Sequence, residues 1–172
     1  MKEPTTPEEV KVLHNLLRSD PQHYLQIVNK WIADNPGNSH AYFDRHFVWM
    51  KLGEPQRAIA DLDMVIQLDP KPVTFWARGD VYRCVGEYEK ALEDLDRAEA
   101  IDPAQWAEGA FGLVSQADCH ARLGNVAAAL ACCERLPDDF WTGSIEGAPG
   151  GSKAEIAEKL RLFAADARRG RV

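Results

Sequence analysis

The sequence predicts an all-α protein built from repeated helical hairpins, and three observations support this. Landmarks recur at one offset of 33 residues: Leu52-Gly53-Glu54 with Val85-Gly86-Glu87, the Asp-Leu-Asp runs at 61–63 and 94–96, and Pro70 with Pro103. Apolar residues recur three and four positions apart, as they do on one face of a helix. Glycine and proline fall at the segment ends, where helices stop. A period of this length is typical of arrays in which each hairpin packs on its neighbours.

The first element is a hairpin at 5–37, with helices expected over 7–18 and 21–33. Its apolar stripes contain Val10, Leu13 and Leu17, and then Leu25, Val28, Trp31 and Ile32. The hairpin has the size of a repeat but lacks the recurring residues. Such a unit is expected at the end of an array, where it covers the first full repeat.

Two regular repeats follow, at 38–71 and 72–103. In the second, helices are expected over 73–85 and 88–100, and Gly86 suits the left-handed turn between them. Proline at 103 closes the unit, because proline cannot continue a helix. One stripe contains Phe75, Gly79 and Tyr82, and the other contains Ala91, Leu95 and Ala98. The small residues predict a close crossing of the two helices.

A third, degenerate repeat is expected at 104–136, because Gly124 follows Gly86 by 38 residues and so implies a five-residue insertion. Residues 137–152 form a loop containing glycine and proline, either a tether or a segment that contacts a partner. Phe140 and Trp141 at its start are expected to pack on the array. A capping helix is expected at 153–172, where Ser152 and Glu155 match a capping box.

These residues resemble the tetratricopeptide repeat (TPR), a family of 34-residue helical hairpins. The unit at 72–103 carries the family's pattern as Gly79, Tyr82, Gly86, Ala91, Leu95, Ala98 and Pro103. The unit before it has His46 where a small residue is usual, and the unit after it has His120 at the aromatic position. The resemblance implies a short right-handed superhelical array of about three repeats that acts in protein–protein interaction.

In arrays of this family, the first helices of the hairpins line a concave groove. The resemblance places on that wall His40, Phe43, Phe47, Met50 and Lys51, then Trp76, Asp80 and Arg83, and then Val114, Asp118 and Arg122. The three aromatic residues would anchor a peptide, and Asp80, Arg83 and Asp118 would orient it. The alternative is that the aromatic residues belong to the core, and helical spacing alone does not decide between the two.

The same mapping argues against one familiar specificity. The family's chaperone-tail clamp holds two carboxylates with lysine, asparagine and arginine at fixed inner positions. The corresponding positions here hold Glu9, Leu13, Asp44, Val73 and Ala77. A terminal carboxylate would therefore meet no cationic fork.

The chain has 172 residues and a formal net charge of −7, which argues against general nucleic-acid binding. Residues 153–172 carry +3, so the remainder carries −10. This balance favours a basic-amphipathic protein or peptide partner, and it allows a homodimer in which the basic end docks on the acidic array. The start resembles no secretory signal and no stretch is apolar enough to span a membrane, so a cytoplasmic location is expected.

Catalytic and cofactor motifs are not evident. Asp118-Cys119-His120 contains three reactive residue types, but successive helical residues face different directions. The four cysteines are expected to be reduced thiols, and no cofactor or metal is expected. The repeated acids Asp61, Asp63, Asp94 and Asp96 are expected to form a solvated face, with a docking patch as the alternative.

The sequence thus favours a non-enzymatic interaction module that binds a peptide or protein segment. Two alternatives stay open. One is a small secretion or assembly chaperone that holds a client protein, and the other is a structural protein that self-associates.

Overall fold

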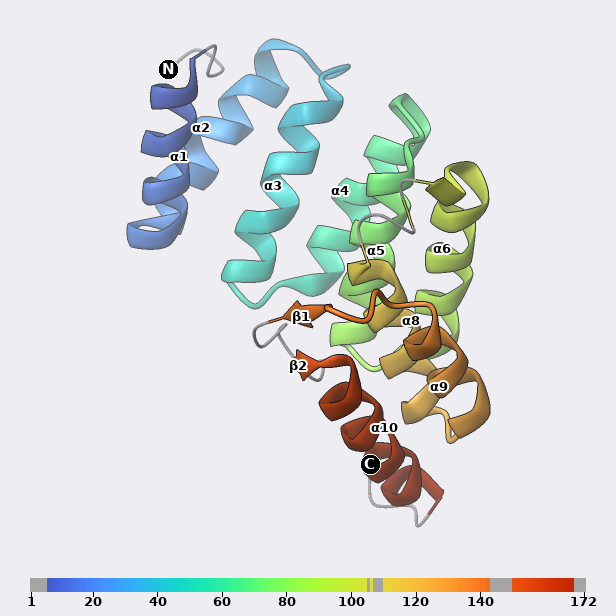
Figure 1. The fold of residues 1–172 in the computed structure, drawn as a ribbon. Coiled ribbons are helices and arrows are strands. Elements are labelled where there is room, and N and C mark those ends of the chain that lie inside the picture. The colour runs from blue at the N-terminus through green and yellow to red at the C-terminus, as the bar shows by residue number, and fades with distance from the viewer. Residues whose placement is uncertain (1–5, 105, 107–109, 143–149, 169–172) are drawn as a thin grey trace. The chain divides into compact units, whose positions relative to one another are not determined.

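The computed structural model describes residues 6–104, 106, 110–142 and 150–168. Over these ranges the chain is helical apart from turns and one short strand pair (Figure 1), which confirms the predicted all-α class. The chain divides into two compact units, residues 1–74 and 75–172. The boundary falls near the start of one helix, and each unit is described by itself.

The first unit contains α1 (Pro7–Ser19), α2 (Pro21–Asp34), α3 (Ser39–Lys51) and α4 (Pro55–Leu68), followed by the first residues of α5 (Pro72–Cys84). Helices α1 to α4 pack in series, each against its neighbour in this group. The observed bounds of α1 and α2 lie within two residues of the predicted ones. Local chemistry explains the start of α2, since Asp20 accepts a hydrogen bond from the His23 N–H at 3.0 Å. The core of the unit joins α1, α2 and α3 through Leu13, Tyr24, Ile27, Val28, Trp31, Ala41 and Val48.

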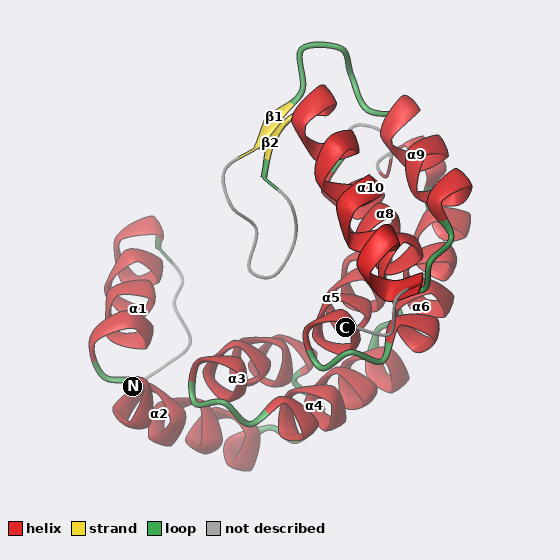
Figure 2. Cartoon of the chain, turned by 90° about the horizontal axis from the view of Figure 1, so that it is seen from below, coloured by secondary structure: helices red, strands yellow, loops and turns green. Residues whose placement is uncertain are grey.

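The second unit contains the rest of α5, then α6 (Tyr88–Ile101), α8 (Phe111–Arg122), α9 (Val126–Glu134) and α10 (Lys153–Arg168). Helix α8 packs on both α6 and α9, and α10 packs on both α8 and α9. Strands β1 (Trp141–Thr142) and β2 (Gly151–Ser152) pair antiparallel, with Trp141 opposite Ser152. Figure 2 shows this strand pair beside the start of α10.

Glycines set the turns and one helix crossing. Gly53, Gly86 and Gly124 have φ angles of 74°, 83° and 78°, so the left-handed turn predicted at Gly86 follows α3 and α8 as well. A Cβ atom on Gly79 would lie 3.1 Å from the carbonyl oxygen of Ala91. The predicted close crossing of α5 and α6 is therefore confirmed.

The expectation of a solvated acidic face is wrong for Asp61 and Asp94, which are buried. The Arg45 Nε and Nη2 atoms donate to the Asp61 carboxylate at 2.8 and 2.7 Å. Arg78 makes the same two bonds to Asp94, both at 2.7 Å. The carboxylates are covered because an arginine 16 residues earlier reaches them from the first helix of the same hairpin. Arg45 also donates to Asn29 on α2 at 2.8 Å, so it links successive hairpins.

The third hairpin has a different polar link. With the offset of 38, Gln116 and Cys132 replace Arg78 and Asp94. The Gln116 Nε2 atom donates to Asp96 at 2.8 Å and to Glu99 at 3.1 Å, so it bonds to α6. Its Oε1 atom is buried and has no hydrogen-bond partner among the described residues.

The predicted capping box is present at the start of α10. The Ser152 N–H donates to the Glu155 carboxylate at 2.8 Å, and the Glu155 N–H donates to the Ser152 hydroxyl at 3.4 Å. The helix buries Ile156, Leu160 and Ala164. No helix in the described ranges is both long enough and apolar enough to cross a membrane.

The loop before α10 departs from expectation at one residue. Phe140 is half-buried, but Trp141 is 69% exposed, so the expectation that it packs on the array is wrong. Side chains alternate along β1, and Thr142 takes the inward position. Residues 143–149 lie outside the described residues, and with them most of the segment expected to tether the cap or contact a partner.

Candidate interaction surface

The first unit presents an aromatic surface on α3, formed by Phe43, His46 and Phe47. Their spacing of three and four residues places them on one helix face. The Phe43 and Phe47 rings meet edge to face with centroids 5.5 Å apart, and the His46 and Phe47 centroids lie 3.9 Å apart. Phe47 is 45% exposed and Phe43 is half-buried, so this aromatic surface is open on its outer side.

His46 keeps this surface uncharged near neutral pH. Only 3% of the residue is exposed, and burial lowers the pKa of its imidazole to about 4. Its Nδ1 atom contacts the backbone carbonyl oxygen of Phe43, which favours an N–H on that nitrogen. His46 occupies the repeat position held by Gly79 in the next hairpin, and its ring lies against the neighbouring aromatic side chains.

A cavity of about 280 Å³ adjoins the aromatic surface at Phe43. Its apolar lining is completed by Val65 of α4 and Val73 of α5, while Ser39 and Thr74 contribute hydroxyl-bearing side chains. Its other lining residues are His40, Asp69 and Lys71, of which the last two form an ion pair. Ligand pockets for whole small molecules are usually about 300 Å³ or larger, so the cavity better suits one side chain of a longer partner.

His40 and Lys51 lie near opposite ends of α3, and both are exposed. The structure thus places four of the predicted residues, His40, Phe43, Phe47 and Lys51, along one accessible helix. Val65 and Val73 of the cavity were not predicted as site residues, because they belong to other helices and carry no distinctive motif.

In the second unit, Arg83 and Asp118 are buried and form an ion pair at 3.2 Å between α5 and α8. Arg83 also donates to Asp80 at 2.9 Å, and Arg122 donates to Asp118 at 3.3 Å. Burial opposes the charge on Arg83, but the carboxylates of Asp80 and Asp118 outweigh it, so the pKa of Arg83 is raised. The pair is almost inaccessible and holds α8 against α5.

The remaining predicted residues of this unit are partly accessible. Trp76 is half-buried, and its indole N–H is buried without a hydrogen-bond acceptor in the part of the chain that is described. The guanidinium of Arg122 lies 4.3 Å from the centre of the Phe163 ring on α10. The capping helix therefore covers one end of the α8 face.

The reactive residue types in α8 are in an inert setting. Cys119 is fully buried, and burial raises the pKa of its thiol to about 12. A thiol of this kind stays protonated and is a poor nucleophile. Among the described residues, no group of three histidine, cysteine, aspartate or glutamate side chains is arranged to hold a metal ion.

Comparison with known proteins agrees on the fold. No protein-family model matches the chain, and no curated protein matches it in sequence. A crystal structure of MamA superposes with a TM-score of 0.64 at 16% identity, over 96% of this chain and 86% of that one. The thermophilic TPR protein TTC0263 of Thermus thermophilus superposes with a TM-score of 0.61 at 20% identity, over 97% of this chain and 84% of that one.

A third solved structure is the C-terminal part of a TPR repeat-containing protein from Cytophaga hutchinsonii. Its TM-score is 0.65 at 13% identity, over 91% of this chain and 58% of that one. The fold is therefore TPR-like, as the repeated residues of the sequence predict. Folds of this type serve in general as scaffolds for protein–protein interaction.

Proposed function

We propose that this chain is a non-enzymatic interaction module and that the aromatic surface on α3 binds a peptide segment of a protein partner. The observation that carries the proposal is the position of Phe47. It is 45% exposed, and its ring contacts Phe43, which lines an open cavity. An accessible aromatic residue beside a cavity is the arrangement found at binding hot spots.

Each part of the surface has a role in this proposal. Phe47 covers an apolar side chain of the peptide, and the cavity between Phe43, Val65 and Val73 receives a second one. The exposed ends of α3 carry His40 and Lys51, which orient the peptide through polar contacts. In the second unit, Trp76 and Asp80 offer further contacts, while the buried Arg83–Asp118 pair supports them from beneath.

The charge of the chain favours a basic-amphipathic partner. The formal net charge is −7, and long-range attraction of this kind speeds association with cationic segments. Screening by salt reduces it beyond about 10 Å at 0.1 M ionic strength. Binding should therefore weaken as salt rises, while the apolar contacts at Phe47 persist.

Selection from a displayed random-peptide library tests the proposal. The chain should enrich peptides that share apolar residues at fixed spacing, and a Phe47→Ala variant of equal helicity should not enrich them. Val12→Ala is a matched control, because Val12 is 59% exposed on α1, outside this surface. Equal enrichment by the Phe47→Ala variant would remove the aromatic surface from the binding site.

A further inference from the structure

Helix α10 repeats the pattern of α5, which is the first helix of a complete hairpin. Ala77 and Val81 are buried on α5, and Ile156 and Leu160 are buried 79 positions later on α10. Like α8 on α6, α10 packs on the helix that closes the preceding hairpin, which is α9. It therefore stands where the first helix of another hairpin would stand.

On α5, three residues of one stripe contact the second helix of the hairpin, α6. The guanidinium of Arg97 lies 5.5 Å from the centre of the Phe75 ring. Arg78 bonds Asp94, and the Lys90 ammonium lies 5.4 Å from the centre of the Tyr82 ring. This stripe at positions i, i+3 and i+7 is the surface that a second helix covers.

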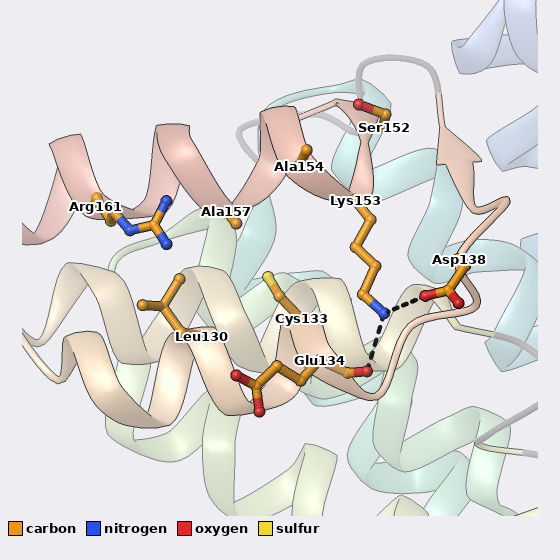
Figure 3. A pocket seen from close by; sticks show the side chains of 9 residues that line it. All are labelled: Leu130, Cys133, Glu134, Asp138, Ser152, Lys153, Ala154, Ala157 and Arg161. Atoms are coloured by element: carbon orange, nitrogen blue, oxygen red, sulfur yellow. Dashed lines mark hydrogen bonds and ion pairs between the residues drawn. The ribbon is translucent and has the colours of Figure 1, made fainter.

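The equivalent stripe on α10 is Ala154, Ala157 and Arg161, and it lines an open cleft of about 360 Å³. Helix α9 supplies the facing residues Leu130, Cys133 and Glu134. Figure 3 shows Arg161 and Leu130 at one end of the cleft and Lys153 and Asp138 at the other. The two alanines are much smaller than Phe75 and Arg78, so the surface is left hollow.

The charges at the two ends of the cleft differ in availability. The Lys153 Nζ atom donates to the Leu136 carbonyl oxygen at 2.8 Å and to Asp138 at 3.0 Å, so it closes the end of α9. Arg161 is about half exposed and pairs with Glu158 at 3.2 Å, a surface contact that contributes little. Residues 153–172 carry +3 in a chain of −7. An incoming helix therefore gains most from an acidic residue opposite Arg161.

We propose that the cleft between α9 and α10 binds an amphipathic helix from a protein partner, which takes the place of a hairpin's second helix. The helix places large apolar side chains against Ala154 and Ala157 and an acidic side chain opposite Arg161. This surface is separate from the aromatic surface on α3, and its test does not depend on the proposed function.

The chain's own α6 supplies the probe. A synthetic peptide of residues 88–101 has the required pattern once two residues are changed. The Lys90→Glu change sets an acid opposite Arg161, which holds the Tyr82 position. The Asp94→Leu change sets an apolar side chain opposite Ala157, which holds the Arg78 position. The full chain should bind this labelled double-substituted peptide saturably, as measured by fluorescence anisotropy. A second peptide carries Asp94→Leu alone and so retains Lys90.

Variants of the full chain locate the binding. Ala157→Trp fills the cleft and should weaken binding of the double-substituted peptide at least tenfold. Arg161→Glu should weaken it about tenfold, and this variant should bind the peptide that retains Lys90 more tightly than the double-substituted one. Lys30→Glu on α2 is the matched charge-reversal control and should change nothing, because Lys30 lies in the other unit.

Circular dichroism checks that each variant keeps its helicity, and Arg161→Glu decides the matter if Ala157→Trp fails to fold. Lack of saturable binding by the unmodified chain would overturn the proposal. So would cleft variants that bind as tightly as the unmodified chain, or an Arg161→Glu variant that still prefers the double-substituted peptide.

Discussion

Arg78 on α5 and Asp94 on α6 form a two-pronged ion pair, with both N–O distances at 2.7 Å and both side chains largely buried. Arg45 and Asp61 repeat it 33 residues earlier, and Trp49 adds a third bond to Asp61 at 2.9 Å. The repeated acids thus join the two helices of each hairpin. Their burial turns a feature that reads as surface charge into part of the core.

Asp94→Ala should destabilise the chain by about 3 kcal/mol, because it leaves the Arg78 guanidinium buried without its carboxylate. The free energy of unfolding from urea denaturation measures the loss. Glu93→Gln is the control, since Glu93 is an exposed neighbour on the same helix and should change stability by less than about 0.5 kcal/mol. Equal losses in the two variants would refute a structural role for the ion pair.

The third hairpin should accept the missing pair. Cys132→Asp alone should destabilise by about 3 kcal/mol, since it places an unpaired carboxylate at a position that is 8% exposed. Adding Gln116→Arg should recover at least about 1 kcal/mol, because the new guanidinium meets both the introduced carboxylate and the acids of α6. A double-mutant cycle measures this coupling, and zero coupling would contradict the equivalence of the three hairpins.

Stability should fall with acid through His46. The folded-state pKa is about 4 and the unfolded value is about 6.5, so the unfolded chain binds the proton first. The contribution is complete above about pH 6.5 and is lost as pH falls from about 6.5 to 4, by about 3 kcal/mol at most. Urea unfolding across this pH range should show a shallower slope for His46→Ala. An unchanged slope would show that His46 is not the group that titrates.

The capping box should hold the first turn of α10. Ser152→Ala should cost about 1 kcal/mol, because it removes the side-chain oxygen that accepts the Glu155 N–H. Amide hydrogen exchange in the first turn of α10 should rise, while exchange in α2 and α3 stays the same. Ser152→Thr keeps the oxygen and should retain most of the protection, and faster exchange throughout the chain would argue against a local effect.

Much of the fold could be predicted because the hairpin signals are local. Gly86 fixes a turn through its own backbone, and Ser152 and Glu155 fix a helix start within one turn. Periodic apolar residues place the helices. Such features need no knowledge of distant contacts, which is why the predicted bounds of α1, α2, α5 and α6 lie within one or two residues of the observed ones.

The site depended on contacts between helices, and these could not be predicted from periodicity alone. Phe43 and Phe47 share a face, but only the structure shows that Phe47 is open while Arg83 and Asp118 are covered. The recurrence of Arg45 at Arg78, in step with Asp61 and Asp94, was a readable sign of pairing. The cavity wall at Val73 had no such sign, because it arises where the start of α5 meets the end of α4.

The most direct test of the central claim is calorimetric titration of a library-selected peptide into the chain and its Phe47→Ala variant. If the aromatic surface on α3 is the binding site, Phe47→Ala should weaken the affinity at least tenfold, as expected for loss of a hot-spot aromatic residue. Val12→Ala should leave it unchanged. Equal affinities for the chain and its Phe47→Ala variant, with helicity preserved, would contradict the proposed site.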